Sequence, residues 1–355
     1  MKFHYEFDIK KLQQPIHHQH KLLLIGSCFT ENIGEKLQKH QFNVLQNPNG
    51  ILFNPVSVSE AIINIIEQKK YTSEDLFQHN ETWHSWQHHS RYSGITAEDA
   101  VHKINTSTQE AHDYLKKADY LLITLGSAWV YTLTEKAANA TVGTVAANNH
   151  KAPADWFLRK LMRVDQVMVV LGTMLDKLGA FNPNIKVIFT ISPVRHLREG
   201  VIDNNRSKAV LIQAVHELND RLGKLYYFPA YELVIDDLRD YRFYAEDLVH
   251  PNYAATEYVW NKFIDACMNE ETKILMKQIA EINLAFQHKP FNPNTEQHKK
   301  FLHSYFEKTK ALQEQYPYLN LSKELEYFIS ATTKWSAPMQ LNFLQPFSHI
   351  LRNPV

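Results

Sequence analysis

The chain has 355 residues, with 38 lysines and arginines against 38 aspartates and glutamates, so its net charge at neutral pH is zero. This balance gives no electrostatic reason to expect a nucleic acid or an anionic membrane as partner. Hydrophobic residues make up 44% of the sequence, which excludes a disordered chain and allows a large buried core. Only two cysteines occur, so a disulfide framework is excluded and a reducing compartment is expected. The polar first twenty residues and the lack of any long apolar run favour the cytoplasm.

Short apolar runs alternate with helical patterns along most of the chain. This rhythm predicts an α/β fold, a three-layer α/β/α sandwich with a mostly parallel sheet. The expected strands are 21–25, 42–45, 120–125, 186–191 and 225–228, and the expected helices are 30–39, 58–68, 96–118, 165–178, 206–222 and 252–268.

Two segments interrupt the alternation, and the C-terminal part changes character. Residues 79–94 are rich in aromatic and histidine side chains and predict a hairpin or an ordered loop. Residues 135–157 form a long polar insertion, expected to act as a wall or lid beside a site. We expect an α/β domain over 1–270 and a helical extension over 271–355, which ends in an irregular, proline-containing tail.

The stretch KLLLIGSCF places a serine where the first strand should turn into a helix. In open α/β sheets, functional groups gather at the carboxyl ends of strands, where helix N-termini present free N–H groups. Gly26 permits a tight turn there, and the hydroxyl of Ser27 would be available as a nucleophile. The alternative is that Ser27 caps the following helix, although Thr30 is also placed to do so.

A nucleophilic serine needs a base, and the base needs an orienting carboxylate. The segment DLVHPN supplies both, because Asp247 and His250 are three residues apart and can face each other within one turn. Pro251 and Asn252 then begin a helix. The alternative is an unrelated surface pair in a chain that has 19 histidines.

These motifs resemble the GSCFA family, which is related to the SGNH/GDSL hydrolases. The resemblance runs over most of residues 20–270 and includes, in order, GSCF, NGILFNP, LLITLGSAWVY, ISPVRH and DLVHPN. It implies an SGNH-hydrolase-like fold and a catalytic triad of Ser27, Asp247 and His250. It also implies that the backbone N–H of Gly50 helps to hold the oxyanion, together with that of Ser27.

The chain departs from the superfamily after its third core strand. The expected Gly-x-Asn-Asp is replaced by Gly126-Ser127-Ala128-Trp129, so the asparagine that completes the oxyanion hole is missing. Ser127, Asn54 or Asn149 are the candidates to replace it. An incomplete hole would weaken hydrolysis without changing the fold.

Four residues are candidates for substrate binding: Arg195, His196, Asn149 and His150. Arg195 and His196 follow the fourth strand and should reach the same rim. Arg195 could hold a carboxylate, a phosphate or a sugar hydroxyl, or it could be an ordinary surface arginine paired with a carboxylate.

Other chemistries are less well supported. Cys28 is expected to be a structural cysteine, because the residue after a strand-end nucleophile points into the packing between sheet and helix. The histidines at 17–20 and 84–89 lack the companions that would make a zinc site, so no metal is expected. No glycine-rich phosphate loop occurs, and no cofactor is expected.

The sequence therefore predicts a serine hydrolase that cleaves a small acyl ester, on a sugar or a similar polar scaffold. Its partner would be that small acylated substrate. Two alternatives stay open: a non-catalytic ligand-binding or scaffold protein on the same fold, and an acyltransferase. The acyl group, the alcohol and the oligomeric state are left open.

Overall fold

The computed structural model describes residues 5–334. The chain divides into two compact units, Met1–Lys277 and Gln278–Val355. The predicted irregular, proline-containing tail follows residue 316. Its first part contains the helix α10 (Ser322–Lys334), which the sequence did not predict, and its remainder lies outside the described residues.

The first unit is built on a five-stranded sheet in which every strand pair is parallel. The strand order is β2-β1-β5-β9-β10, so the chain first moves to one side of β1 and then to the other. This is the flavodoxin-like order, and its topological switch point lies between β1 and β5. The observed strands follow the predicted ones within one residue at each end: β1 (Lys21–Gly26), β2 (Asn43–Gln46), β5 (Tyr120–Leu125), β9 (Lys186–Ile191) and β10 (Tyr226–Phe228).

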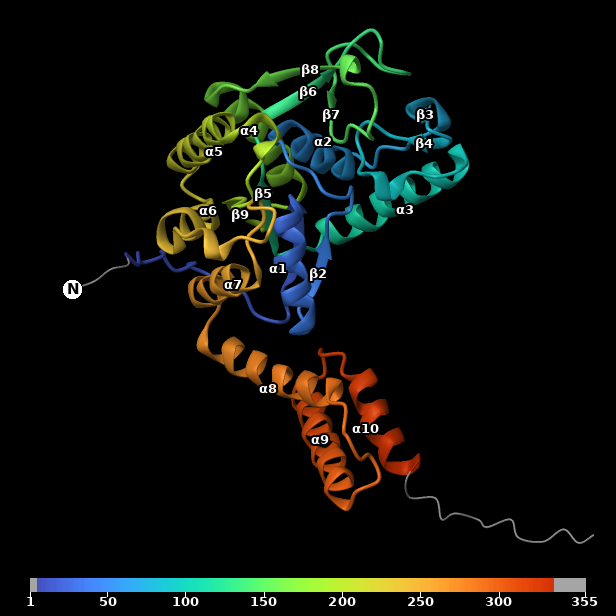
Figure 1. Ribbon diagram of the computed structural model, residues 1–355, viewed down its shortest axis with the longest axis vertical. Coiled ribbons are helices and arrows are strands. Elements are labelled where there is room, and N and C mark those ends of the chain that lie inside the picture. Colours follow the sequence, from blue (N-terminus) through green and yellow to red (C-terminus); the bar gives the residue numbers. More distant parts are fainter. Residues whose placement is uncertain (1–4, 335–355) are drawn as a thin grey trace, which may run out of the picture. The chain divides into compact units, whose positions relative to one another are not determined.

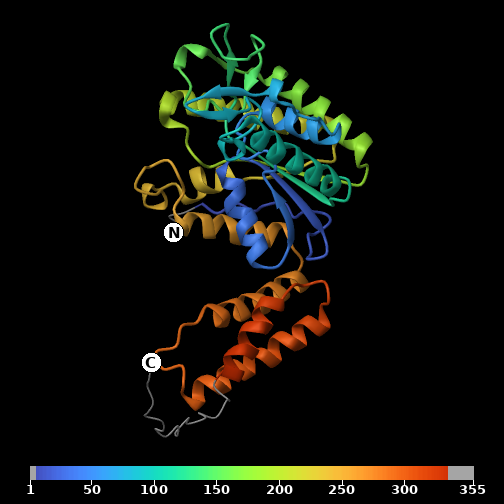
Figure 2. The same cartoon turned by 90° about the vertical axis from the view of Figure 1, so that its right-hand side faces the viewer.

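Helices cover both faces of this sheet (Figures 1 and 2). Side chains of β5 alternate between two cores: Leu121 and Ile123 face one, and Tyr120 and Leu122 face the other. This alternation is the two-residue period of a strand buried on both sides. The first core is closed by α2 (Pro55–Ile66), α3 (Ala97–Leu115), α4 (Val164–Phe181) and α5 (Val201–Leu222), and the second by α1 (Cys28–Lys39), the short α6 (Ala230–Glu232) and α7 (Tyr253–Cys267). The predicted α/β/α sandwich is confirmed.

The two interrupting segments form small antiparallel sheets. Strands β3 (Phe77–His79) and β4 (Thr82–His84) make a hairpin, as the first segment predicted. The polar insertion lies between β6 (Trp129–Leu133) and β8 (Phe157–Leu161), and it contributes the two-residue β7 (Val145–Ala146) to their sheet. The sequence did not predict these three strands, because their apolar and polar residues do not separate cleanly.

The C-terminal region is helical, as predicted. It contains α8 (Glu270–Gln287), which begins in the first unit, followed by α9 (Glu296–Gln315) and α10 (Ser322–Lys334). Leu302, Leu312 and Phe328 are buried, and the ring of Phe286 meets that of Tyr327 edge to face. None of the helices in residues 5–334 is long and apolar enough to cross a membrane.

Candidate active site at the carboxyl edge of the sheet

Ser27 lies between the end of β1 and the start of α1. Its N–H donates to the carbonyl of Thr124 (3.2 Å), and its own carbonyl accepts the N–H of Thr30 (2.9 Å). The hydroxyl does not cap α1, and neither does Thr30, which lies inside the helix, so the predicted Thr30 cap is wrong. Ser27 is 0% exposed, and its Oγ makes no hydrogen bond with any described residue. Buried polar groups are usually hydrogen-bonded, so an unpartnered buried hydroxyl calls for an explanation, and a catalytic role is one.

The turn before Ser27 has no room for a side chain. Gly26 has φ +143°, and a Cβ there would lie 2.2 Å from the carbonyl oxygen of Thr124. The N–H of Gly26 donates to Oδ1 of Asn47, the first residue after β2 (2.9 Å). The glycine of the GSCF motif is therefore required by the close approach of three neighbouring strand ends.

Asp247 and His250 form the predicted pair. Nδ1 of His250 lies 2.6 Å from Oδ2 of Asp247, while Oδ1 accepts the N–H groups of His250 (3.0 Å) and Val249 (2.9 Å). The pKa of Asp247 is lowered to about 2 by hydrogen bonds from the backbone N–H of His250, from its ring and from the backbone N–H of Val249. The carboxylate is therefore charged at neutral pH, and it orients the imidazole with Nδ1–H toward itself and Nε2 as the basic nitrogen.

The corner that carries this pair is fixed beside the loop after β9. The N–H of Arg195 donates to the carbonyl of Val249 (3.1 Å), and the N–H of Ala245 donates to the carbonyl of His250 (2.8 Å). In the sheet, β5 lies between β9 and β1. Ser27 follows the carboxyl end of β1, and the pair lies beside the loop that follows the carboxyl end of β9. No hydrogen bond joins Ser27 to His250, and the complete triad stays a prediction.

The two expected backbone donors of the oxyanion hole are already in use. The N–H of Gly50 donates to the carbonyl of Asn47 (2.7 Å), just as that of Ser27 donates to Thr124. Gly50 has φ +78°, and a Cβ there would lie 2.1 Å from Cβ of His89. The glycine is thus needed for a tight turn, and the assignment of its N–H to the oxyanion stays a prediction that would require this N–H to leave the carbonyl of Asn47.

Ser127 and Asn54, two candidates for the third donor, also have local partners. Oγ of Ser127 accepts the N–H of Trp129 (3.0 Å) and lies 3.2 Å from Oγ of Ser207. Asn54 caps α2, where its Oδ1 accepts the N–H of Ser57 (2.9 Å) and its amide donates to the Ser57 hydroxyl (3.0 Å). Both residues are therefore explained by local structure.

A cavity of about 470 Å³ is lined by five of the ten predicted site residues, and the three residues of the proposed triad are not among them. Its lining comes from the segments after β5 and β9, from the polar insertion and, through the apolar Val249, from the Asp–His corner, so the insertion does form a wall. The lining includes Asn54, Ser127, Asn148, Asn149, Arg195, His196, Arg198 and Val249, with Phe53, Trp129 and Tyr131 among the aromatic residues.

Arg195 matches neither sequence-based interpretation completely. Its guanidinium stacks on the ring of Tyr244 at 4.1 Å, with Tyr241 at 5.1 Å. It makes no ion pair with a carboxylate within the described part of the chain. A charge held on an aromatic face beside a cavity can bind an anionic or hydroxylated ligand.

His196 lies at the cavity wall as predicted, but it is not a cation. Its ring packs edge to face on Phe53 (centroids 5.3 Å apart), and its Nε2 is buried without a hydrogen-bond partner in residues 5–334. Burial, with smaller contributions from Lys208 and His250, lowers the pKa of His196 to about 3. It is therefore a neutral imidazole at physiological pH.

His150 does not line this cavity, and its predicted role in substrate binding stays a prediction. Its Nε2 lies 2.9 Å from the carbonyl of Ser85, and its Nδ1 lies 3.2 Å from Oγ of Ser90. The side chain is buried beside Phe77 and Trp86, and it does not line the cavity. Burial is the main cause that lowers the pKa of His150 to about 4. It holds the hairpin to the insertion.

Lys208 is a feature that the sequence analysis missed. Its Nζ donates to the carbonyls of Gly126 and Ser192, both at 2.7 Å, and so joins the residues that follow β5 and β9. The residue is 1% exposed, and burial lowers its pKa to about 7. The sequence contains one indication of this burial, because helical spacing places Lys208 on the same buried face as Asn204, Leu211 and Val215.

Cys28 begins α1 and is partly buried. Burial is the largest cause that raises the pKa of its thiol, with Glu31 adding to the effect. A raised pKa lowers the thiolate fraction and so argues against Cys28 as the nucleophile.

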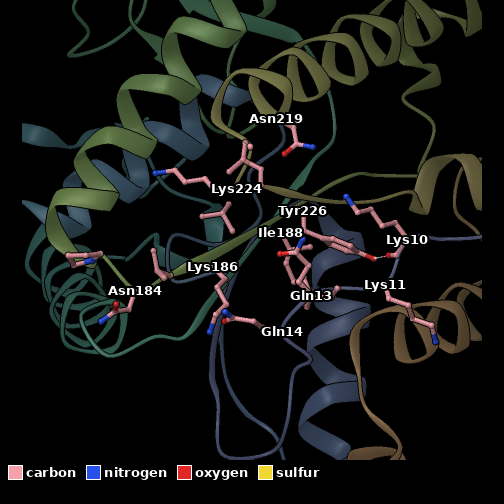
Figure 3. Close-up of a pocket in the computed structure, with 16 residues that line it drawn as sticks. Lys10, Lys11, Gln13, Gln14, Asn184, Lys186, Ile188, Asn219, Lys224 and Tyr226 are labelled. Carbon is pink, nitrogen blue, oxygen red and sulfur yellow. Dashed lines mark hydrogen bonds between the residues drawn. The ribbon is translucent and has the colours of Figure 1, made fainter.

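A second cavity, of about 700 Å³, lies at the opposite end of the sheet, where β9 and β10 begin (Figure 3). It is lined by Lys10, Lys11, Lys186 and Lys224 but by none of the predicted site residues. No group of three or more histidine, cysteine or carboxylate side chains in the described residues could hold a metal ion.

Comparison with family models finds two matches along the chain. The model of the GSCFA family matches residues 21–263, and that of the GSCFA domain protein, C-terminal domain, matches residues 279–333. No curated protein matches the sequence.

Two similar solved structures are esterases. The acetyl xylan esterase Est2A from the rumen bacterium Butyrivibrio proteoclasticus is 12% identical, with a TM-score of 0.36, over 71% of this chain and 64% of that one. A carbohydrate esterase family 3 protein from Talaromyces cellulolyticus is 10% identical, with a TM-score of 0.34, over 74% and 99%. Likenesses this slight establish neither fold nor reaction, which rest on this chain's own topology and side chains. The family match covers more than half of the sequence, and the chain belongs to the GSCFA family.

Proposed function

We propose that this protein is an ester hydrolase that uses Ser27 as nucleophile, His250 as base and Asp247 to orient the base. The observation that carries the proposal is the 2.6 Å hydrogen bond between Asp247 and Nδ1 of His250. This bond prepares Nε2 to accept a proton, at the same edge of the sheet as a serine whose hydroxyl has no other partner.

The reaction would proceed in two halves. Oγ of Ser27 attacks the acyl carbonyl while Nε2 of His250 removes the serine proton. The tetrahedral intermediate then releases the alcohol, which takes that proton from His250, and leaves an ester on Ser27. Water attacks this acyl-enzyme with His250 again as base, the acid leaves, and the proton returns to Ser27. Asp247 stabilises the imidazolium in both halves.

Ser27 must become accessible before this can happen. Its hydroxyl is covered here, whereas the side chains of Asp247 and His250 are 49% and 51% exposed. Catalytic hydrogen bonds are often long or absent without substrate and tighten in the complex. We expect the Asp–His corner to approach Ser27 when a substrate enters.

The cavity supports a small acyl ester on a polar scaffold such as a sugar. It carries amide and guanidinium groups beside the aromatic side chains of Trp129 and Tyr131. Aromatic faces with a few placed polar groups are typical of sites for hydroxylated ligands. An acyltransferase would need the same residues, and an acceptor alcohol would replace the water.

A fluorophosphonate probe tests the proposal, because it labels an activated nucleophilic side chain, serine above all. We expect the wild-type protein and Cys28→Ala to be labelled, and Ser27→Ala not to be. Hydrolysis of p-nitrophenyl esters of increasing chain length would then define the acyl group. Labelling that survives Ser27→Ala but is lost in Cys28→Ala would make the cysteine the nucleophile.

One observation favours a non-catalytic ligand-binding protein instead. The hydroxyl of Ser27 is covered, and the N–H groups of Ser27 and Gly50 donate to carbonyls. If the wild-type protein neither reacts with the probe nor hydrolyses any of the esters, this alternative replaces the hydrolase.

A further inference from the structure

Asn47 is tied to the Ser27 corner through three of its four polar groups. Its N–H donates to the carbonyl of Leu24 (2.8 Å), and its carbonyl accepts the N–H of Gly50 (2.7 Å). Its side-chain Oδ1 accepts the N–H of Gly26, the residue before Ser27 (2.9 Å). Asn47 is 1% exposed and has φ +46°, a conformation that asparagine tolerates better than most residues.

The fourth group of Asn47, the Nδ2 amide, is buried and has no hydrogen-bond partner in the described residues. The hydrogen bond from Gly26 fixes the orientation of the side-chain amide. If oxygen and nitrogen were exchanged, the amide NH₂ would face the N–H of Gly26, and two donors would meet. An unused donor in the interior costs free energy, so its presence calls for a reason.

We propose that Nδ2 of Asn47 is the side-chain donor to the oxyanion that forms when Ser27 attacks an ester. The inference rests on the proposed hydrolase function. In the tetrahedral intermediate the former carbonyl oxygen carries a negative charge, which Nδ2 stabilises by donating a hydrogen bond without transferring its proton. The orientation of the donor is already fixed through Oδ1, so the amide itself does not have to reorient once a substrate has reached Ser27.

This assignment fills the role left by the missing third-strand asparagine. Of the three side chains predicted for this role, Ser127 and Asn54 have local partners, and Asn149 lines the cavity and stays a candidate. The N–H groups of Ser27 and Gly50 donate to carbonyls. The Nδ2 of Asn47 is unused, and its side chain is bonded to the residue adjacent to the nucleophile.

Asn49 provides a matched control two residues away. It is also buried, at 3% exposure, but its Nδ2 lies 3.1 Å from Nε2 of His88. Its amide therefore has a structural partner. A substitution at Asn49 removes a buried amide from the same turn without removing an unused donor.

The test compares Asn47→Asp with Asn47→Gly, Asn49→Asp and the wild-type protein. Asn47→Asp keeps the oxygen that accepts from Gly26 and suits the positive φ, but it loses the donor. Asn47→Gly is unstrained at this φ and uncharged, and it loses both groups. We expect kcat for a p-nitrophenyl ester to fall roughly 10²–10³-fold in both variants, with KM changed only a few-fold. In Asn49→Asp we expect kcat to stay within a few-fold.

A purely structural role for Asn47 predicts a different result. Asn47→Asp would then keep the kcat of the wild type, because the bond to Gly26 is retained, and only Asn47→Gly would lose activity. That outcome overturns the inference and leaves the proposed hydrolase intact. A wild-type protein that neither reacts with the fluorophosphonate nor hydrolyses the ester overturns both. Circular dichroism and urea unfolding of each variant separate lost folding from lost catalysis.

Discussion

The two corners that carry the proposed catalytic groups are built in opposite ways. The corner at Ser27 is fully buried. The hydroxyl of Ser27 and the Nδ2 of Asn47 have no hydrogen-bond partner in the described residues. The corner at Asp247 and His250 is half exposed, and the carboxylate accepts three hydrogen bonds. Burial keeps the reactive group away from water and other partners, whereas an exposed base depends on hydrogen bonds for its orientation. The proposed chemistry requires His250 to accept the proton of Ser27, so the two corners must meet during the reaction.

The largest effect should come from removing either reacting group. We expect Ser27→Ala and His250→Ala each to lower kcat by roughly 10⁶-fold, and the double variant to be no worse than either single one. Groups that act in the same step are not additive. Additive losses in the double variant would show that the corners work separately. The measurement is ester hydrolysis under saturating substrate.

The orienting carboxylate should have the next largest effect. Asp247→Asn is expected to lower kcat by roughly 10⁴-fold, because an amide favours the wrong tautomer of His250. The fold should persist, since the corner is on the surface. Asp240→Asn is the control, because Asp240 is an exposed carboxylate on the same segment that accepts the N–H of Arg242. If Asp247→Asn keeps most of its kcat, the hydrogen bond to His250 is structural only.

The buried ammonium of Lys208 should make stability depend on pH. Its folded pKa of about 7 lies below the ordinary 10.5, so between these values the unfolded chain binds a proton that the folded chain does not. Stability from this residue therefore rises with pH across that window. Lys208→Met should remove this rise, and Lys160→Met, at an exposed lysine, should not. Urea unfolding at pH 7 and pH 9.5 measures the difference, and an equal slope in wild type and Lys208→Met would contradict it.

The smallest effect on catalysis is expected at His150. We expect His150→Ala to lower the free energy of unfolding by about 1–3 kcal/mol, because the carbonyl of Ser85 and the hydroxyl of Ser90 lose a partner. The kcat/KM of the folded protein should stay within a few-fold. Lys151→Ala controls for strain, since Lys151 also has a positive φ (57°) but is exposed. A large loss of kcat/KM in His150→Ala alone would support the predicted role of His150 in substrate binding.

The sequence by itself was sufficient to predict where the strands of the parallel sheet lie and that Asp247 contacts His250. Strand and helix periods are local, and β5 and β9 begin and end where their apolar runs predict. Asp247 and His250 are three residues apart, so a single turn brings them together. Contacts between residues within one turn of the chain can be predicted without knowledge of the tertiary structure.

Only the tertiary structure decided which polar groups are already in use. The N–H of Gly50, the amide of Asn54 and the ring of His150 all satisfy partners inside the protein, whereas Nδ2 of Asn47 does not. Lys208 resembles any helical lysine until α5 packs it against the ends of β5 and β9. The physical reason is that the availability of a donor depends on every acceptor within about 3 Å, and most of those acceptors belong to distant parts of the chain.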